Sequence, residues 1–324
     1  MSCDYAKGLS SYVNKGKCGL PEKFDDEETV ETKAKMVADM IKNAKHVVVH
    51  TGAGISTAAG IPDFRGPKGV WTLEQKGAAP GISLSFNDTV PTVTHMALVA
   101  MQEAGFVKYL ISQNIDGLHL KSGFPRSKLS ELHGNMFIEE CDQCKRQFVR
   151  DTCVTTVGQK CLDKPCPIPK KGGRTCRGKL YDNILDWDAE LPFDDLQEAD
   201  NHSKMADLNI CLGSTLQIIP SGKLPIANKA NGGKLVICNL QPTKYDNLAD
   251  LIVNTYIDAM MLQIVKLLGI EIEQYVQESD PTRMKLIKTE QIFEWTLRKW
   301  QPIAKSTRKL PCKDRKAKKL KKEA

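Results

Sequence analysis

The sequence contains no long hydrophobic run and no apolar segment near its start. No apolar stretch approaches the roughly 18 residues that a membrane-spanning helix needs, and the opening MSCDYAKGLSS lacks the hydrophobic segment of a signal peptide. We therefore expect a soluble intracellular protein without a membrane partner. A length of 324 residues, 41% of them hydrophobic, allows one large domain and one small one.

Disulfide bonds are also not expected, although the chain has 11 cysteines. Six of them fall between Cys141 and Cys176, where the spacing indicates a metal site, so we expect a reducing compartment.

The net charge of +7 is concentrated at the C-terminal end of the sequence. Residues 305–324 hold ten Lys and Arg against Asp314 and Glu323, a net of +8, so the other 304 residues sum to about −1.

Short apolar runs alternate with helical patterns along the chain. Strand patterns occur in 45–51, 108–117, 208–215, 234–241 and 249–255, and helical spacing occurs in 28–44, 91–105 and 258–269. This alternation predicts an α/β fold with a doubly wound, Rossmann-like parallel sheet. Ligands of such sheets lie beyond the carboxyl ends of the strands. Four segments are expected there: His50-Thr51-Gly52, Gln113-Asn114, Gly213-Ser214-Thr215 and Asn239-Leu240-Gln241.

The stretch HTGAGISTAAGIPDFRG, residues 50–66, is similar to a dinucleotide-binding turn. Gly52 and Gly54 allow the backbone to approach a pyrophosphate, which the N-terminus of a following helix would also attract. A dehydrogenase fingerprint would have a third glycine where Thr57 stands, so hydride transfer is disfavoured. We expect the helix to break before a loop that carries Asp63, Phe64 and Arg65. A purely structural glycine turn is the alternative.

Five motifs follow one another: GAGIS, GIPDFRG, QNIDGLH, ELHGN and LGSTLQIIPSG, with a four-cysteine module after the fourth. With them the chain resembles the sirtuins, NAD-dependent protein-lysine deacylases, over about residues 1–270. The stretches YAKGLSSYVNKGKCGLPE, RGPKGVWT, HGNMFIEEC and NLQPTK are similar to the class IV branch, most of all to its sirtuin-six type. The resemblance implies that NAD is consumed, with nicotinamide and O-acyl-ADP-ribose as products.

The resemblance assigns roles to single residues. His133 in ELHGN matches the general base, which takes a proton from a ribose hydroxyl. Asn114 orients the ribose side, Asp116 holds the carboxamide, and Ile61 packs on the nicotinamide ring. Phe64 closes over the ring, and Arg65 contacts phosphate or ribose. Together with Gly52, Gly54, Asp63 and Gln113, the further NAD contacts implied are Ala53, Thr57, Trp71, Gly213, Ser214, Thr215, Asn239, Leu240, Gln241 and Ile257.

The cysteine module indicates zinc. Cys141 and Cys144 have the C-x₂-C spacing of a zinc site, whereas the second pair is drawn from Cys153, Cys161, Cys166 and Cys176. The resemblance favours Cys166 and Cys176. Four sulfur ligands leave no open position, so the zinc would be structural.

The resemblance also implies a binding site for acyl-lysine peptides. NILDWDAELP, residues 183–192, matches the segment that pairs with the substrate peptide; on its own it is an edge strand or a loop. Candidates for an apolar acyl pocket are Ile115, Met136, Val157, Ile184 and Ile218. Acidic acyl groups are not expected, because the Tyr and Arg pair of succinyl-preferring sirtuins is missing.

We expect four regions. These are an N-terminal extension (1–27), a discontinuous NAD-binding Rossmann-like domain (28–138 and 180–270), a zinc-binding module (139–179) and a C-terminal extension (271–324). The basic tail predicts nuclear import and contact with nucleosomal DNA, although a solvated disordered end explains it as well.

The favoured function is deacylation, including long acyl chains, of histone tails or other chromatin proteins. Mono-ADP-ribosyl transfer to protein remains open, because both reactions begin with the same loss of nicotinamide. A non-catalytic, NAD-sensing protein that binds chromatin or DNA is the remaining alternative.

Overall fold

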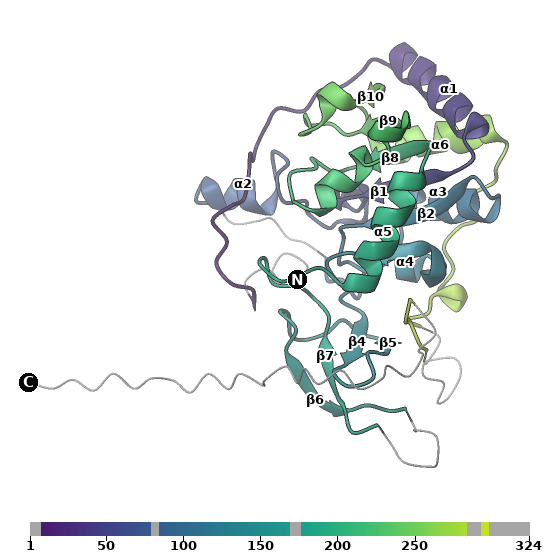
Figure 1. The fold of residues 1–324 in the computed structure, drawn as a ribbon. Helices are drawn as coiled ribbons and strands as arrows, with labels where there is room; N and C mark the ends of the chain where they lie inside the picture. Colours follow the sequence, from purple (N-terminus) through teal and green to yellow (C-terminus); the bar gives the residue numbers. More distant parts are fainter. Residues whose placement is uncertain (1–7, 79–83, 169–175, 284–292, 298–324) are drawn as a thin grey trace, which may run out of the picture.

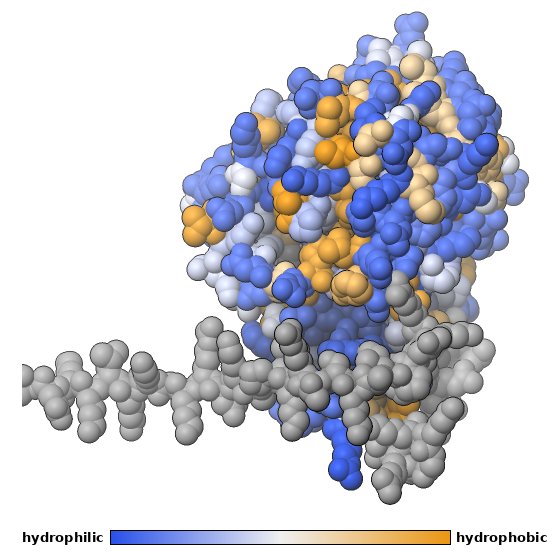
Figure 2. Space-filling model, in the orientation of Figure 1, coloured by the Kyte–Doolittle hydropathy of each residue, from blue (hydrophilic) through white to orange (hydrophobic). Residues whose placement is uncertain are grey.

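The computed structural model describes residues 8–78, 84–168, 176–283 and 293–297. The predicted tail, residues 305–324, lies outside them. In the described part, no helix combines the length and the apolar character that crossing a membrane requires. The face in Figure 2 is mostly hydrophilic, with apolar side chains gathered in patches over the upper part of the molecule.

The upper part of the molecule is built on a six-stranded sheet in which every neighbouring pair is parallel (Figure 1). The order is β10-β9-β8-β1-β2-β3. The strands are β1 (Val47–Thr51), β2 (Val107–Ser112), β3 (Leu129–Glu131), β8 (Leu208–Leu212), β9 (Lys234–Cys238) and β10 (Leu251–Val253). Every residue of β1 and β8 is buried, as expected of strands covered on both faces.

Helices cover both faces of this sheet, so the prediction of a doubly wound sheet is confirmed. One face carries α1 (Glu27–Asn43), α3 (Val93–Glu103) and α6 (Ile257–Leu268), and α6 packs against both α1 and α3. The other carries α5 (Phe193–Met205), which crosses the front in Figure 1, and the 3₁₀ segment η5 (Ser221–Ile226). The side chain of Asp26 caps α1 by accepting from the Thr29 amide at 2.8 Å.

The remaining helices of the described residues are short. They are α2 (Val70–Gln75), α4 (Leu118–Lys121), η2 (Ala53–Ile55), η3 (Thr57–Ala59), η4 (Arg126–Lys128), η6 (Lys229–Asn231), η7 (Asp246–Leu248) and η8 (Gln277–Ser279).

The predicted helix directly after β1 is wrong. The chain makes only the two 3₁₀ turns η2 and η3, which end at Gly60 in the left-handed region (φ 82°). Tertiary contact outweighs local helix formation here, because the Gly54 amide donates to the Gly213 carbonyl at 2.9 Å. The loop is therefore held against the end of β8.

A second, antiparallel sheet forms the lower part of the molecule (Figure 1). Its order is β5-β4-β7-β6, with β4 (Ile138–Cys141), β5 (Gln147–Val149), β6 (Cys161–Pro165) and β7 (Lys179–Asp182). Its small core contains Phe148, Leu180 and the buried cysteines Cys141, Cys166 and Cys176. The strands of this sheet lie between Ile138 and Asp182, and the predicted zinc-binding module of residues 139–179 lies within these limits. The limits of the predicted domains remain a prediction.

Candidate active site

A cavity of about 580 Å³ opens beyond the carboxyl ends of β1, β2, β8 and β9. This is within the size range of small-molecule sites. Most residues predicted for NAD line it: Gly52, Ala53, Gly54, Ile61, Asp63, Phe64, Arg65, Trp71, Gln113, Asn114, Asp116, His133, Gly213, Ser214, Thr215, Asn239 and Gln241. The structure thus brings together residues that follow five strands, β1, β2, β3, β8 and β9, and residues of one long loop.

Three glycines that line the cavity, Gly52, Gly54 and Gly213, lie in close contact. A Cβ atom on Gly52 would lie 2.6 Å from the Gly213 carbonyl oxygen, and one on Gly54 would lie 2.7 Å from the Gly213 Cα. Gly213 itself has φ of +63°, a left-handed conformation that favours glycine. The bare backbone of these loops leaves main-chain groups at the cavity wall. Such a surface fits a dinucleotide pyrophosphate.

His133 follows β3 and lies on the cavity wall. Its Nδ1 is 2.8 Å from the backbone carbonyl oxygen of Gln113, an atom that can only accept, so Nδ1 carries the proton. The neutral imidazole then has its lone pair on Nε2. Burial lowers the pKa of His133, which favours this neutral form. The residue is thereby prepared to act as a base.

Two polar side chains after β2 are held in fixed orientations. Asn114 Nδ2 donates to the Gly52 carbonyl oxygen at 3.0 Å. Asp116 is buried and accepts from Ser56 Oγ at 2.7 Å and from the Leu118 amide at 2.9 Å. Burial raises the pKa of Asp116. Both side chains are therefore already ordered, so binding a polar ligand would cost little further side-chain entropy.

Several aromatic rings line the cavity and contact one another. The rings of Phe64 and Trp71 are 4.8 Å apart, and that of Trp187 lies 5.3 Å from Trp71. The Arg65 guanidinium lies 4.6 Å from the Trp71 ring, and its Nε donates to the Lys15 carbonyl oxygen at 2.8 Å. The loop is braced internally, since an Asp63 carboxylate oxygen accepts from the Gly66 amide at 3.0 Å.

Three of the residues predicted to bind NAD are not among those lining the cavity: Thr57, Leu240 and Ile257. The side chain of Thr57 is exposed, and Ile257 packs into the core at the start of α6. Conversely, the sequence analysis did not identify Leu9, Tyr12 and Ser56, which do line the cavity. Ser56 lies within GAGIS, and Leu9 and Tyr12 lie within YAKGLSSYVNKGKCGLPE, so all three belong to stretches that carry the resemblance.

The predicted acyl-pocket residues divide between two cavities. Ile115, Ile184 and Ile218 line the main one. Met136 and Val157 line a second cavity of about 330 Å³, and Phe86 lines both. Phe86 is therefore the lining residue that the two cavities share.

Residues 183–192 form neither helix nor strand. Of the two alternatives for this segment on its own, an edge strand or a loop, the structure therefore shows the loop. Seven of its residues line the main cavity: Ile184, Leu185, Asp186, Trp187, Ala189, Glu190 and Leu191. The Leu185 amide donates to the His133 carbonyl oxygen at 3.2 Å. The segment thus lies directly beside the candidate base.

The small sheet holds a cluster of four cysteines. The Sγ atoms of Cys141, Cys144, Cys166 and Cys176 all lie within 4.8 Å of one another. Cys141 and Cys176 are separated by 3.8 Å, and Cys144 and Cys166 by 3.7 Å. Zn–S bonds of about 2.3 Å in a tetrahedron place the sulfurs about 3.8 Å apart, so the cluster fits zinc.

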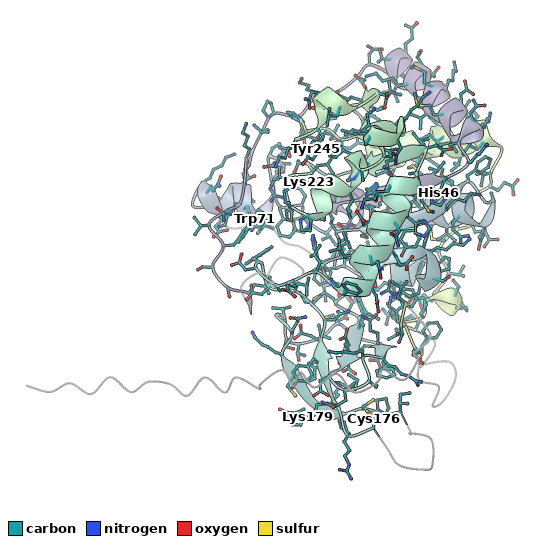
Figure 3. The ribbon with its side chains drawn as sticks, viewed as in Figure 1. His46, Trp71, Cys176, Lys179, Lys223 and Tyr245 are labelled. Atoms are coloured by element: carbon teal, nitrogen blue, oxygen red, sulfur yellow. The ribbon has the colours of Figure 1, made fainter. Side chains whose placement is uncertain are left out.

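The cluster includes Cys166 and Cys176 and leaves out Cys153 and Cys161. Figure 3 shows Cys176 in the lower part of the molecule, away from Trp71 at the cavity. Four thiolate ligands would complete the coordination of zinc, which therefore would hold this sheet together and take no part in chemistry.

Comparisons with known proteins agree with this geometry. The profile described as "Sir2 family" matches residues 81–220. The protein "NAD-dependent protein deacetylase Sirt6" of Drosophila melanogaster is 57% identical over 299 residues, which cover 92% of this chain and 93% of that protein. "NAD-dependent protein deacetylase SRT1" of Oryza sativa subsp. indica is 42% identical over 92% of this chain and 61% of its own length.

A similar solved structure is "Sir2-p53 peptide-NAD+". It has a TM-score of 0.55 and 30% sequence identity, and the match covers 72% of this chain and 98% of that one.

Proposed function

The chain belongs to the Sir2, or sirtuin, family of NAD-dependent protein deacetylases, and on that premise we propose that His133 is the general base of its deacetylation reaction. The observation that carries this proposal is the hydrogen bond from His133 Nδ1 to the Gln113 carbonyl oxygen. It leaves Nε2 as a proton acceptor on the wall of the cavity predicted to hold NAD.

NAD supplies the electrophile, a ribose carbon that loses nicotinamide and bonds to the acyl oxygen of the substrate lysine. His133 then takes a proton from a ribose hydroxyl. Asn114 Nδ2 is engaged by Gly52, which leaves its Oδ1 to accept from the ribose. In this proposal the Asp116 carboxylate would face the carboxamide, and Ile61 and Phe64, which line the same cavity, would exclude water from the reacting carbon.

Product analysis tests this proposal. Labelled NAD is incubated with acetyl-lysine and myristoyl-lysine histone peptides, and the products are identified by mass spectrometry. Deacylation predicts free nicotinamide, O-acyl-ADP-ribose and deacylated peptide in equal amounts. Labelled protein as the main product would indicate ADP-ribosyl transfer instead, and binding of NAD without turnover would indicate a sensor.

We also propose that acyl chains longer than acetyl are accepted. The support is Phe86, which lines both the main cavity and the second cavity, where Met136 and Val157 lie. An acyl chain that reaches past Ile115 and Phe86 would bury its methylene groups there, each worth about 0.8 kcal/mol. Long-chain substrates would therefore gain affinity that acetyl substrates lack.

Histone tails and a nuclear location are further proposals, and they rest on the basic residues 305–324. Lys and Arg that contact DNA release counterions, so binding weakens with salt at a log–log slope of about 0.9 per phosphate. Truncation after Pro302 should flatten this slope and reduce nuclear retention, yet leave deacetylation of a short peptide intact. Equal slopes for the full and truncated proteins would exclude the tail as the main contact.

A further inference from the structure

Residues 293–297, which are distant in sequence from the residues that line the cavity, lie beside the small sheet (Figure 1). Glu294 forms an antiparallel bridge with Phe148 of β5. The Val149 amide donates to the Phe293 carbonyl oxygen at 2.9 Å, and the Trp295 amide donates to the Gln147 carbonyl oxygen at 2.8 Å. This segment therefore extends the edge of the sheet next to β5.

Trp295 turns its indole away from this edge and into the protein. It is only 4% exposed. Indole Nε1 donates to Glu131 Oε2 at 2.8 Å, and the Trp295 carbonyl oxygen accepts from Arg126 Nε at 3.0 Å. Trp295, from the C-terminal part of the chain, is thus hydrogen-bonded to Glu131, the last residue of β3.

Glu131 and Asn135 close the turn that carries His133. The second carboxylate oxygen of Glu131, Oε1, accepts from Asn135 Nδ2 at 2.6 Å. Both residues are buried, Glu131 at 6% exposure and Asn135 at 0%. The Glu131 carboxylate thus receives one donor from each side, the Trp295 indole and the Asn135 amide.

The base of this turn is fixed to α5 as well. The Arg126 guanidinium forms a two-pronged ion pair with Asp195, with N–O distances of 2.8 and 2.9 Å. Asp195 Oδ1 also accepts from the Glu131 amide at 2.9 Å. Three segments far apart in the sequence therefore meet at Glu131, two residues before the candidate base.

We propose that Trp295 is a positioning residue for His133, acting through Glu131 and the turn of residues 131–135. This inference rests on the proposed role of His133. The bond to Gln113 fixes the tautomer of the imidazole, whereas Glu131 and Asn135 fix the turn from which it projects. Without the indole donor, one oxygen of a buried carboxylate would lose its partner, and the turn would shift to find another.

Trp295→Phe tests the inference, because it removes the Nε1–H donor and keeps an aromatic ring. The matched control is Phe293→Leu, which removes apolar volume from the same segment, where the Phe293 ring lies 6.4 Å from that of Trp295. For Trp295→Phe we expect kcat of deacetylation to fall about 5- to 50-fold, as displacement of a catalytic group by a fraction of an ångström does. KM for NAD and peptide should stay within about twofold.

Exchange of labelled nicotinamide into NAD separates positioning from general damage. It reports the steps before His133 acts, so it should stay within about twofold of wild type in Trp295→Phe. An equal loss of exchange and deacetylation, or identical behaviour of Trp295→Phe and Phe293→Leu, would overturn the inference.

A double-mutant cycle is a second test of the coupling between Trp295 and Glu131. Glu131→Gln alone turns an amide N–H towards either Trp295 or Asn135, both of which are donors. Combined with Trp295→Phe, the amide can face the apolar ring while its oxygen accepts from Asn135. We expect the double variant to be no slower than the slower single variant. Multiplicative losses would contradict the coupling.

His133→Ala in the same assays keeps the two proposals distinct. If it deacetylates normally, the role of His133 is wrong. If it is inactive while Trp295→Phe matches wild type, only the positioning role of Trp295 is wrong.

Discussion

His133 and Gln113 are joined by a 2.8 Å hydrogen bond from the imidazole Nδ1 to the backbone carbonyl oxygen. A carbonyl oxygen holds no proton, so the bond selects the tautomer with a free lone pair on Nε2. The strand order makes this pairing possible, because β2 and β3 are parallel neighbours that end at the same edge.

The pH dependence of deacetylation follows from this environment. Burial lowers the pKa of His133 below its ordinary value of 6.5, and the neutral form is the active one. We therefore expect the acidic limb of kcat/KM, which reports the free enzyme, to be centred below pH 6.5. An acidic limb centred above pH 7 would contradict the burial of the base.

Removal of a zinc ligand should unfold the small sheet. Cys141→Ser leaves three thiolates in the cluster, so we expect zinc content well below one per chain and a free energy of unfolding lower by about 3 kcal/mol or more. Cys161→Ser is the control, since Cys161 lies outside the cluster. Elemental analysis and thermal unfolding of both variants check this, and full zinc content in Cys141→Ser would refute the ligand set.

Buried histidines should make the fold sensitive to acid. His50 is 1% exposed and its pKa is lowered from 6.5 to about 4 by burial. A lowered pKa gives stability that is complete above pH 6.5 and is lost as the pH falls towards 4, about 3 kcal/mol in total for this residue. His50→Gln keeps a donor for Asn209 Oδ1 and should flatten the fall of the unfolding midpoint between pH 6.5 and 4. An unchanged slope would show that His50 is not the group responsible.

Acyl-chain preference should depend on Val157, a 6% exposed residue of the second cavity. Val157→Phe would fill that space, so we expect kcat/KM for myristoyl-lysine peptides to drop about tenfold or more, by the loss of two or more buried methylenes. Acetyl-lysine turnover should stay within about twofold. Val157→Ala is the matched control, which keeps the space open. Equal losses for both substrates in Val157→Phe would argue against a channel.

Much of the fold was predictable because it rests on local patterns. The β-branched run of β1, the amphipathic spacing of α1 and the small residues after each parallel strand all act over short distances. They suffice to place Gly52, Asn114 and Gly213 at one edge of the sheet.

What failed depends on distant contacts. The turn after β1 follows Gly213 instead of its own helical preference, and Trp295 lies 164 residues from its acceptor Glu131. The positions of Leu9 and Tyr12 at the cavity likewise leave no local pattern. The spacing of the C-x₂-C pair alone predicted two metal ligands. Cys166 and Cys176 could be chosen as the other two only from the resemblance to sirtuins.

The central claim, that His133 is the base of an NAD-dependent deacetylase, is tested most directly by His133→Tyr assayed for deacetylation and for nicotinamide exchange. His202→Gln is the control, since His202 stacks on Tyr109 and does not line the cavity. We predict that His133→Tyr stays folded, loses about 10²- to 10⁴-fold in deacetylation and still exchanges nicotinamide, as loss of a general base implies. Deacetylation by folded His133→Tyr at a rate near that of wild type would contradict the claim.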